Sequence, residues 1–347
     1  MGVMFTRRIL ITIMGILSLS FLRGNKTAMA QLFFKPEKQR EARTTVNLFK
    51  EGDRALIGVS GDKSPLEMVN EAVSLIGGFE RLNLKDKSVL VKPNVVSGES
   101  NPATTNPEVV HAVVRLLYEH GAKKVYVGDM SAMLTLSTMR NMKKAGIEKA
   151  AKDAGAEVIA LEDYDWVEVE LPGARYIKSA YVTEWLYKAD IIINVPVIKT
   201  HRSASYSICL KNFIGCTHLR QRPYLIDSSH WEELIAEFNL AYTPHLNIVD
   251  GTVSMIEGGP WSGTPADTNL IIASGDRTGA DITGLGIIKS FGKWPMVTAK
   301  DVWEQRQIRH AIELGIGQRR EDMKLVTGKG SRDFQGLMEK ARKHIRL

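Results

Sequence analysis

From residue 54 onward the sequence alternates short runs rich in β-branched residues with segments whose apolar positions repeat every three or four residues. Runs of the first kind predict strands and segments of the second kind predict helices. Strands are predicted at 55–59, 88–91, 124–127, 157–161, 191–195, 246–249 and 270–273. Helices are predicted to begin at Pro65 and Pro107 and to cover most of 137–154, 231–240 and 276–289. This alternation is typical of an α/β fold with a mainly parallel sheet and helices on both of its faces.

Short polar clusters follow four of the predicted strands. In an open parallel sheet the carboxyl ends of the strands line one edge, and ligands bind in a cleft there. If these strands are parallel neighbours, the following side chains converge on one cleft: Lys92, Asn94, Asp129, Lys199, His201 and Asp250. Lys211 and Asn212 come shortly afterwards and would complete its wall.

The residue types in this predicted cleft favour an anionic ligand. Three lysines with asparagine amides offer positive charge and hydrogen-bond donors to a carboxylate or a phosphate ester. The alternative is that the lysines merely extend into solvent, as most lysines do. We therefore predict Lys92, Asn94, Lys211, Asn212 and Asp250 as ligand-binding residues.

Proton transfer is the catalytic chemistry that the cleft suggests. Lys199, His201 and Asp129 are the candidate catalytic residues, because an imidazole titrates near neutral pH and a neighbouring lysine favours its neutral form. Asp129 is a candidate for orienting the histidine or, with Asp250, for holding a divalent cation. The alternative is that the histidine is a hydrogen-bonded bystander and that the acids cap turns.

A glycine-rich stretch at 257–263 is a further candidate for anion binding. Backbone amides at Gly258 and Gly259 can wrap around an anion, and Trp261 suggests an aromatic lid over the cleft. The alternative is a tight turn that only glycine can form.

Two cysteines, Cys209 and Cys216, are too few for an iron–sulfur cluster. Three alternatives stay open for them: a disulfide in an oxidising compartment, a reactive thiol, or buried free cysteines. No cofactor can be named from the sequence, and a divalent metal is the candidate that stays open.

The first thirty residues resemble a twin-arginine signal sequence. Arg7 and Arg8 precede an apolar run over 9–22, and Ala28-Met29-Ala30 has the small-residue pattern of a cleavage site. The run is shorter than the roughly 20 residues of a membrane span, so no stable span is expected in the mature protein. Cleavage near Ala30–Gln31 would place that protein in the periplasm or another extracytoplasmic space, with the export machinery as its partner. An uncleaved anchor or a general secretion signal are the alternatives.

The charge of the chain argues against nucleic acid as a partner. The net charge is +7, but the signal-like segment supplies four of these charges without a single acid. Lys and Arg are otherwise spread without runs, and no nucleic-acid-binding motif is present. We expect an extended, exposed lead-in at 31–53 and an α/β domain over 54–347.

Several short motifs, in order, resemble family 362 of the domains of unknown function (DUF362), with a match over about 55–290. The motifs are Lys92-Pro93-Asn94, Thr105-Asn106-Pro107, Asn194-Val195-Pro196, Lys199-Thr200-His201, Leu210-Lys211-Asn212, Val249-Asp250-Gly251 and Gly258-Gly259-Pro260. Many members carry an appended ferredoxin-like segment with clustered cysteines. This chain lacks those cysteines, so the resemblance implies no iron–sulfur cluster here.

Three classes of function stay open, and the sequence does not settle whether the protein is an enzyme. The first is an exported protein that binds a small anion, with Lys199 and His201 performing acid–base chemistry. The second is a non-catalytic periplasmic binding protein or cofactor-carrying accessory protein. The third is a metal-cofactor enzyme loosely like lactate racemase, a comparison of architecture only.

Overall fold

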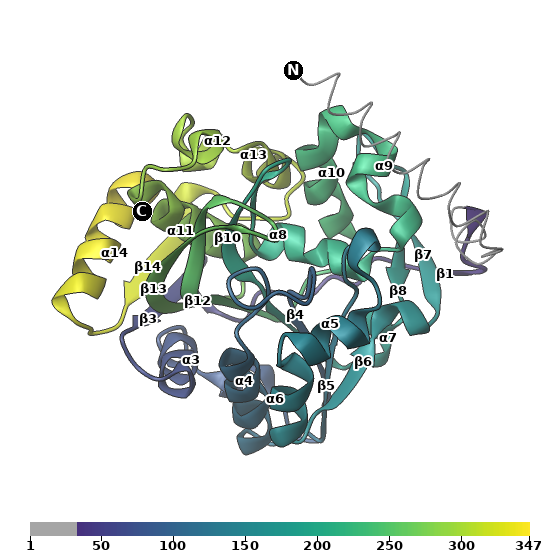
Figure 1. Cartoon of the computed structure of the whole chain (residues 1–347), viewed down its shortest axis with the longest axis horizontal. Coiled ribbons are helices and arrows are strands. Elements are labelled where there is room, and N and C mark those ends of the chain that lie inside the picture. Colours follow the sequence, from purple (N-terminus) through teal and green to yellow (C-terminus); the bar gives the residue numbers. More distant parts are fainter. Residues whose placement is uncertain (1–32) are drawn as a thin grey trace.

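The computed structural model describes residues 33–347, so the predicted signal sequence at 1–30 lies outside the described residues. Most strands of this part form one sheet, which crosses the middle of the molecule with helices on both sides (Figure 1). The strands of this sheet are β2 (Lys50–Glu51), β3 (Arg54–Gly61), β4 (Ser88–Pro93), β5 (Lys124–Asp129), β6 (Glu157–Ala160), β9 (Ile191–Val195), β10 (Val197–His201), β11 (Ser205–Ser207), β12 (Leu246–Gly258), β13 (Gly263–Ser274) and β14 (Met323–Thr327).

The sheet is mainly parallel, as predicted. Its order is β14-β3-β13-β12-β9-β4-β5-β6, and β10 pairs with the outer half of β12. Along this order β13 alone runs antiparallel to its neighbours β3 and β12. The carboxyl ends of β4, β5 and β9 therefore lie at one edge, where the predicted polar clusters begin.

Helices cover the two faces of the sheet (Figure 1). On one face lie α3 (Pro65–Ser74), α4 (Pro107–Glu119), α5 (Thr138–Lys144) and α6 (Ile147–Asp153). On the other lie α8 (Cys209–Asn212), α10 (Trp231–Phe238), α11 (Arg277–Ser290), α13 (Arg306–Glu313) and α14 (Arg332–Ile345). Three short helices complete the described set: α7 (Trp185–Lys188), α9 (Pro223–Ile226) and α12 (Pro295–Thr298).

The period-two geometry of the strands explains why the sheet has a hydrophobic core on each face. In β9, Ile192 packs into one core, while Ile191 and Ile193 pack into the other. Successive side chains of a strand point to opposite faces, so a strand covered on both sides is mainly apolar. The apolar residues Ile191, Ile192, Ile193 and Val195, with Asn194 as the single polar residue among them, reflect this arrangement in the sequence.

Local signals fix where the predicted helices begin. Ser64 accepts a hydrogen bond from the backbone of Glu67, and the Glu67 carboxylate accepts one from the Ser64 backbone, so a capping box is present at the start of α3. Asn106 caps α4 in the same manner through the backbone N–H of Glu108. Both caps hold helices that follow strands of the central sheet.

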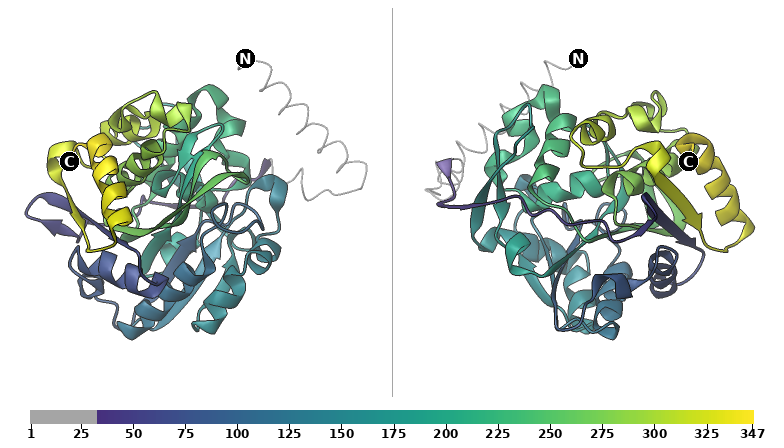
Figure 2. Two further views of the ribbon diagram at one scale, coloured as in Figure 1. Left: turned by 60° about the vertical axis from the view of Figure 1, so that its left-hand side comes forward. Right: turned by 180° about the vertical axis from the view of Figure 1, so that it is seen from behind.

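A second, three-stranded sheet was not predicted. It consists of β1 (Lys38–Arg40), β7 (Trp166–Glu170) and β8 (Ser179–Thr183). Its strand β1 belongs to the predicted lead-in, which is extended but anchored to the domain. Arg43 donates hydrogen bonds to the backbone oxygens of Ala189 and Asp190, each at 2.6 Å, and Phe49 is completely buried. The view from behind in Figure 2 shows this purple segment running across the molecule.

The route of the chain after β9 builds one wall above the sheet edge. The chain passes Pro196 and continues as β10, which pairs with β12 between Val197 and Lys199. The hairpin of β12 and β13 extends beyond the central sheet, and β10 and β11 form a second hairpin beside it. This extension encloses the space above the carboxyl ends of β4 and β5.

Candidate functional site

A pocket of about 490 Å³ lies at this edge of the sheet. Of the residues predicted from sequence, seven line it: Asn94, Asp129, Lys199, His201, Lys211, Asn212 and Gly259. Lys92 lies beneath the lining and is bonded to two of these side chains. Segments that are far apart in the chain thus converge on one cavity, as the strand-end pattern predicted.

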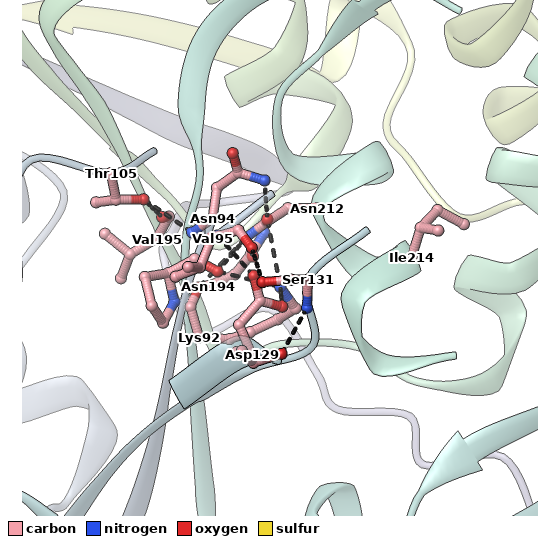
Figure 3. Close-up of polar contacts among 12 residues, drawn as sticks. Lys92, Asn94, Val95, Thr105, Asp129, Ser131, Asn194, Val195, Asn212 and Ile214 are labelled. Carbon is pink, nitrogen blue, oxygen red and sulfur yellow. Dashed lines mark hydrogen bonds and ion pairs between the residues drawn. The ribbon is translucent and has the colours of Figure 1, made fainter. Parts of the chain in front are cut away.

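The floor of the pocket is a buried ion pair. The Lys92 Nζ atom lies 2.6 Å from Asp129 Oδ1 and 3.3 Å from Asn212 Oδ1, and it also donates to the backbone oxygen of Pro93 (Figure 3). The second Asp129 oxygen accepts a hydrogen bond of 2.6 Å from the backbone N–H of Val95. Both charges are therefore compensated, as a buried pair requires.

An asparagine relay extends from this pair across the sheet. Asn212 accepts from the Asn94 amide at 3.1 Å and donates to Asn194 Oδ1 at 2.8 Å. Asn194 lies opposite Lys92 in the pairing of β4 and β9, and it donates to Asn247 of β12 at 2.9 Å. Asn194 occurs in the family-like motif, but its place in a predicted apolar strand concealed its role in the network.

Gly215 allows the chain to pass directly over the ion pair. A Cβ atom at this position would lie 2.0 Å from Asp129 Oδ1 and 2.7 Å from Lys92 Nζ. Neither contact is sterically possible. Any side chain here would displace the floor of the pocket.

Lys199 rises from β10 and is almost completely buried, with 1% of its surface exposed. Its Nζ atom donates to Asn94 Oδ1 and to the backbone oxygen of Ala103 at 2.6 Å. Burial, reinforced by the charge of Lys211, lowers the pKa of Lys199 well below its usual value. This direction favours the neutral amine over the ammonium form.

His201 is held in a defined tautomer. Its Nδ1 atom accepts hydrogen bonds from the backbone N–H groups of Ser203 and Ala204, at 3.1 and 3.2 Å. Burial, with the charges of Lys211 and Lys199, lowers the pKa of His201 well below its usual value. A neutral imidazole with Nδ1 as acceptor carries its proton on Nε2. His201 therefore offers an N–H donor.

The wall opposite β10 carries two cations with no counter-ion. Among the described residues, Lys211 makes no hydrogen bond or ion pair, and Arg222 makes no ion pair. Arg222 is 5% exposed and donates to the backbone oxygens of Ile214 and Ser131, while its Nε atom has no partner. Burial, then the charges of Arg222 and Lys92, lower the pKa of Lys211 to about 7.

Arg222 was not predicted from the sequence. It lies between two single-turn helices in a stretch without periodicity, so no strand end or motif marks it. Asp129, already paired with Lys92, is the one acid among the described lining residues. The pocket is therefore cationic.

The rest of the lining is largely apolar and aromatic. It includes Val96, Met130, Met133, Leu134, Ile214, Pro223, Trp231, Pro260 and Trp261. Trp261 stands at the tip of the β12–β13 hairpin and is 42% exposed. Gly259, with a φ of +81°, packs so closely that a Cβ atom would lie 2.0 Å from the backbone oxygen of Thr200. The predicted glycine-rich loop is thus a hairpin tip held against the end of β10, at the rim of the pocket.

Comparison with known proteins identifies the family. The model of the domain of unknown function DUF362 matches residues 89–286. This chain belongs to the DUF362 family.

One relative is a thylakoid-associated protein of Synechocystis sp., which is 26% identical over 227 residues, covering 62% of this chain and 67% of that protein. Among solved structures, the lactate racemase apoprotein from Thermoanaerobacterium thermosaccharolyticum is similar at a TM-score of 0.33 and 12% identity, covering 83% of this chain and 87% of that one. In the described part of this DUF362 protein, no helix has the length and apolar character needed to cross a membrane.

Three of the predicted binding residues, Lys92, Gly258 and Asp250, are not among those that line the pocket of this DUF362 protein. Asp250 is fully buried and accepts hydrogen bonds from the Asn101 amide and from the backbone N–H groups of Asn106 and Thr252, at 2.7 to 2.9 Å. Its carboxylate joins the middle of β12 to the loop before α4 and to the residue that caps this helix. Gly258 is the last residue of β12 and has a φ of +88°.

Cys209 and Cys216 are both free and buried in the structure. Burial raises the pKa of Cys216 to about 12 and that of Cys209 well above its usual value, so both are thiols rather than thiolates. Between residues 33 and 347, no three His, Cys, Asp or Glu side chains gather as a metal site would need.

Proposed function

We propose that this DUF362 protein binds a small organic anion, a carboxylate or phosphate ester with an apolar body, in the pocket between Lys199 and Arg222. The observation that carries the proposal is the unpaired charge of the wall, where Lys211 and Arg222 face a cavity whose acid is already paired. Burying a cation without a counter-ion costs free energy. An anion that enters the pocket is therefore attracted by the unpaired positive charge of the wall.

The apolar lining supports the part of the proposal that gives the ligand an apolar body. A pocket of about 490 Å³ is of the size that holds a small organic ligand. Polar groups cluster on the floor and the cationic wall, whereas Met130, Met133 and Trp261 provide apolar surface. This division matches a molecule with a charged head and an apolar or aromatic body.

Within this proposal Lys199 and His201 contact the ligand from β10. The lone pair of a neutral Lys199 amine serves as the base of a proton transfer, and the Nε2–H of His201 stabilises negative charge that develops on a ligand oxygen. Asp129 positions Lys92 and the backbone at Val95, so its contribution is to hold the site in shape.

A thermal-shift screen of carboxylates and phosphate esters tests the binding proposal. A ligand at 100 times its dissociation constant adds about 2.7 kcal/mol to the free energy of unfolding. We expect stabilisation of the wild type, loss of that stabilisation in Arg222→Gln, and full retention in Lys293→Gln, which removes an exposed lysine. Equal stabilisation in Arg222→Gln would mean that the anion binds elsewhere.

Prolonged incubation of the bound ligand separates the two functional classes. Chemical conversion, lost in Lys199→Met, identifies an enzyme. Binding without conversion identifies a periplasmic binding or carrier protein. Elemental analysis and an absorption spectrum of the protein from its native host test for the metal cofactor of the third class.

We further propose that residues 1–30 direct export by the twin-arginine route. The support is the order of Arg7-Arg8, the apolar run and the small-residue cleavage pattern. A reporter fused after residue 35 should reach the periplasm of a bacterial host. Replacing both arginines by lysine should retain it in the cytoplasm, whereas an unchanged distribution would contradict the route.

A further inference from the structure

We propose that Lys211 forms a Schiff base with a 2-oxo carboxylate that carries an apolar side chain. This inference rests on the proposed function, since it takes the same pocket and names the class of molecule that fits it. The carboxylate pairs with Arg222, the carbonyl carbon meets the Lys211 amine, and the side chain packs against the apolar lining.

The three lysines of the site differ in the hydrogen bonds that their amines already make. Lys92 is bound to Asp129, and Lys199 donates to Asn94 and to the backbone oxygen of Ala103. An imine nitrogen keeps neither hydrogen of the amine, so a reaction at Lys199 would leave these two acceptors without a donor. Lys211 has no such bonds within the described chain, and it lines the cavity.

The backbone that carries Lys211 is fixed from behind. It belongs to α8, a single turn whose first two backbone N–H groups, at Cys209 and Leu210, donate to the Asp281 carboxylate at 2.6 and 3.2 Å. The next residue of the same turn, Asn212, is held in the asparagine relay. A nucleophile on a fixed turn needs little ordering before it reacts.

Electrostatics keep the Lys211 amine in its reactive form near neutral pH. The charged or titratable groups that line the pocket with it, or lie beneath the lining, are Lys92 of β4, Asp129 of β5, Lys199 and His201 of β10, Arg202 directly after β10, Arg222 before α9, and Tyr224 of α9. Cations outnumber the one acid, and burial adds to their effect, which agrees with a pKa of about 7. Desolvation and neighbouring cations are the means by which proteins prepare a lysine for attack on a carbonyl.

Two further groups are placed for the reaction. The Nε2–H of His201 is a donor for the carbonyl oxygen, and the Nε of Arg222 is a buried donor without a partner. In the reaction the lone pair of Lys211 attacks the carbonyl carbon and the carbon–oxygen π bond breaks. The two amine protons pass to the oxygen, which leaves as water, and the carbon–nitrogen double bond forms. No oxidant or reductant is consumed.

Reductive trapping with phenylpyruvate tests the inference. The purified protein is incubated with phenylpyruvate and cyanoborohydride near neutral pH, then digested and analysed by peptide mass spectrometry. We expect one adduct per chain, on Lys211, with the mass of phenylpyruvate less one oxygen atom. Labelling should increase as the pH rises through about 7, whereas exposed lysines should require a pH near their usual pKa of about 10.4.

Lys211→Arg is the decisive variant, because it keeps a cation in the wall and removes the nucleophile. It should form no adduct, while the matched surface variant Lys293→Arg should label like the wild type. The position of the adduct is also mapped in the wild-type protein, which requires no variant. The inference can therefore still be contradicted if Lys211→Arg does not fold. An adduct on another lysine, or none at all, overturns it.

Phenyllactate, which has a hydroxyl group in place of the 2-oxo group, separates this inference from the proposed function. If phenyllactate stabilises both the wild type and Lys211→Arg while phenylpyruvate gives no adduct, the Schiff base is wrong and anion binding stands. If neither acid stabilises the protein or forms an adduct, both proposals fail.

Discussion

The floor of the pocket and its wall use the same residue types in opposite ways. On the floor, Lys92 and Asp129 compensate each other, and every heteroatom of the pair has a partner. On the wall, Lys211 is partly buried and Arg222 is 5% exposed, and neither forms an ion pair with a carboxylate of the described residues. The charges of the floor compensate each other, whereas the cations of the wall would be compensated by the anion that we propose as the ligand.

This difference separates stability from function within a single pocket. Charges that are fully paired in the folded protein hold the strand ends in register. A buried charge without a partner lowers the free energy of unfolding. Such charges occur mostly at functional sites, where binding or catalysis requires them. Substitutions on the floor should therefore change folding, and substitutions on the wall should change binding.

The largest expected effect is that of Lys92→Met. It leaves the Asp129 carboxylate buried without its cation, which costs about 3–5 kcal/mol of the free energy of unfolding. Chemical denaturation measures this loss. Lys211→Met, the matched change on the wall, should leave the free energy of unfolding unchanged or raise it, because it removes a cation that has no counter-ion within the described residues. Equal losses in the two variants would contradict the distinction between floor and wall.

Arg222→Gln should have the next largest effect, on affinity. A hydrogen bond to a charged group contributes about 1.5–3 kcal/mol, so the dissociation constant for an anion should rise by at least tenfold. Isothermal calorimetry with any anion found by the thermal-shift screen measures it. The free energy of unfolding without ligand should be unchanged or higher, because a buried cation has been removed.

Gly215→Ala should disturb the floor by sterics alone. Its Cβ would collide with the carboxylate of Asp129, and overpacking of this kind costs about 1–3 kcal/mol. Gly336→Ala is the control, since that helical glycine has no atom within 4 Å of the added carbon. This control should be neutral or slightly stabilising in the same denaturation experiment. Similar losses of unfolding free energy in both variants would show that the close contact between Gly215 and the ion pair has no particular effect.

Taken per pH unit, the smallest effect is a dependence of stability on pH. The folded-state pKa of Lys211 is about 7, below the usual value of about 10.4, so between these values the unfolded chain binds more protons. The free energy of unfolding should therefore rise with pH from about 7 to 10, at no more than about 1.4 kcal/mol per pH unit from this group. Denaturation at several pH values measures the slope, and Lys211→Met should reduce it. An identical slope in that variant would mean that another titratable group causes the pH dependence.

The strand-end pattern was sufficient to predict the convergence of the floor. Lys92 and Asp129 each end a buried parallel strand, and parallel strands place such ends at one edge. The β10 residues Lys199 and His201 were predicted on the same grounds, although their strand pairs with the outer half of β12 rather than with the central strands. The mainly parallel α/β class followed from the same alternation.

What the sequence did not reveal depends on contacts between irregular segments. Arg222 reaches the pocket from a stretch of single-turn helices, where neither period two nor period three to four applies. The antiparallel direction of β13 is set by the hairpin with β12, and the apolar run at 270–273 reads the same in either direction. Asp250 was expected at the cleft because it follows an apolar run, but β12 continues past it and turns its carboxylate toward the start of α4.

The two indole rings at the pocket give the protein a built-in optical signal. Trp231 approaches from α10 and Trp261 from the hairpin tip, so both border the same cavity from different elements. Emission from these rings should change when an aromatic or charged molecule displaces the water around them. Candidate molecules can thus be titrated against unlabelled protein in a fluorimeter, with Trp261→Phe revealing which of the two rings responds.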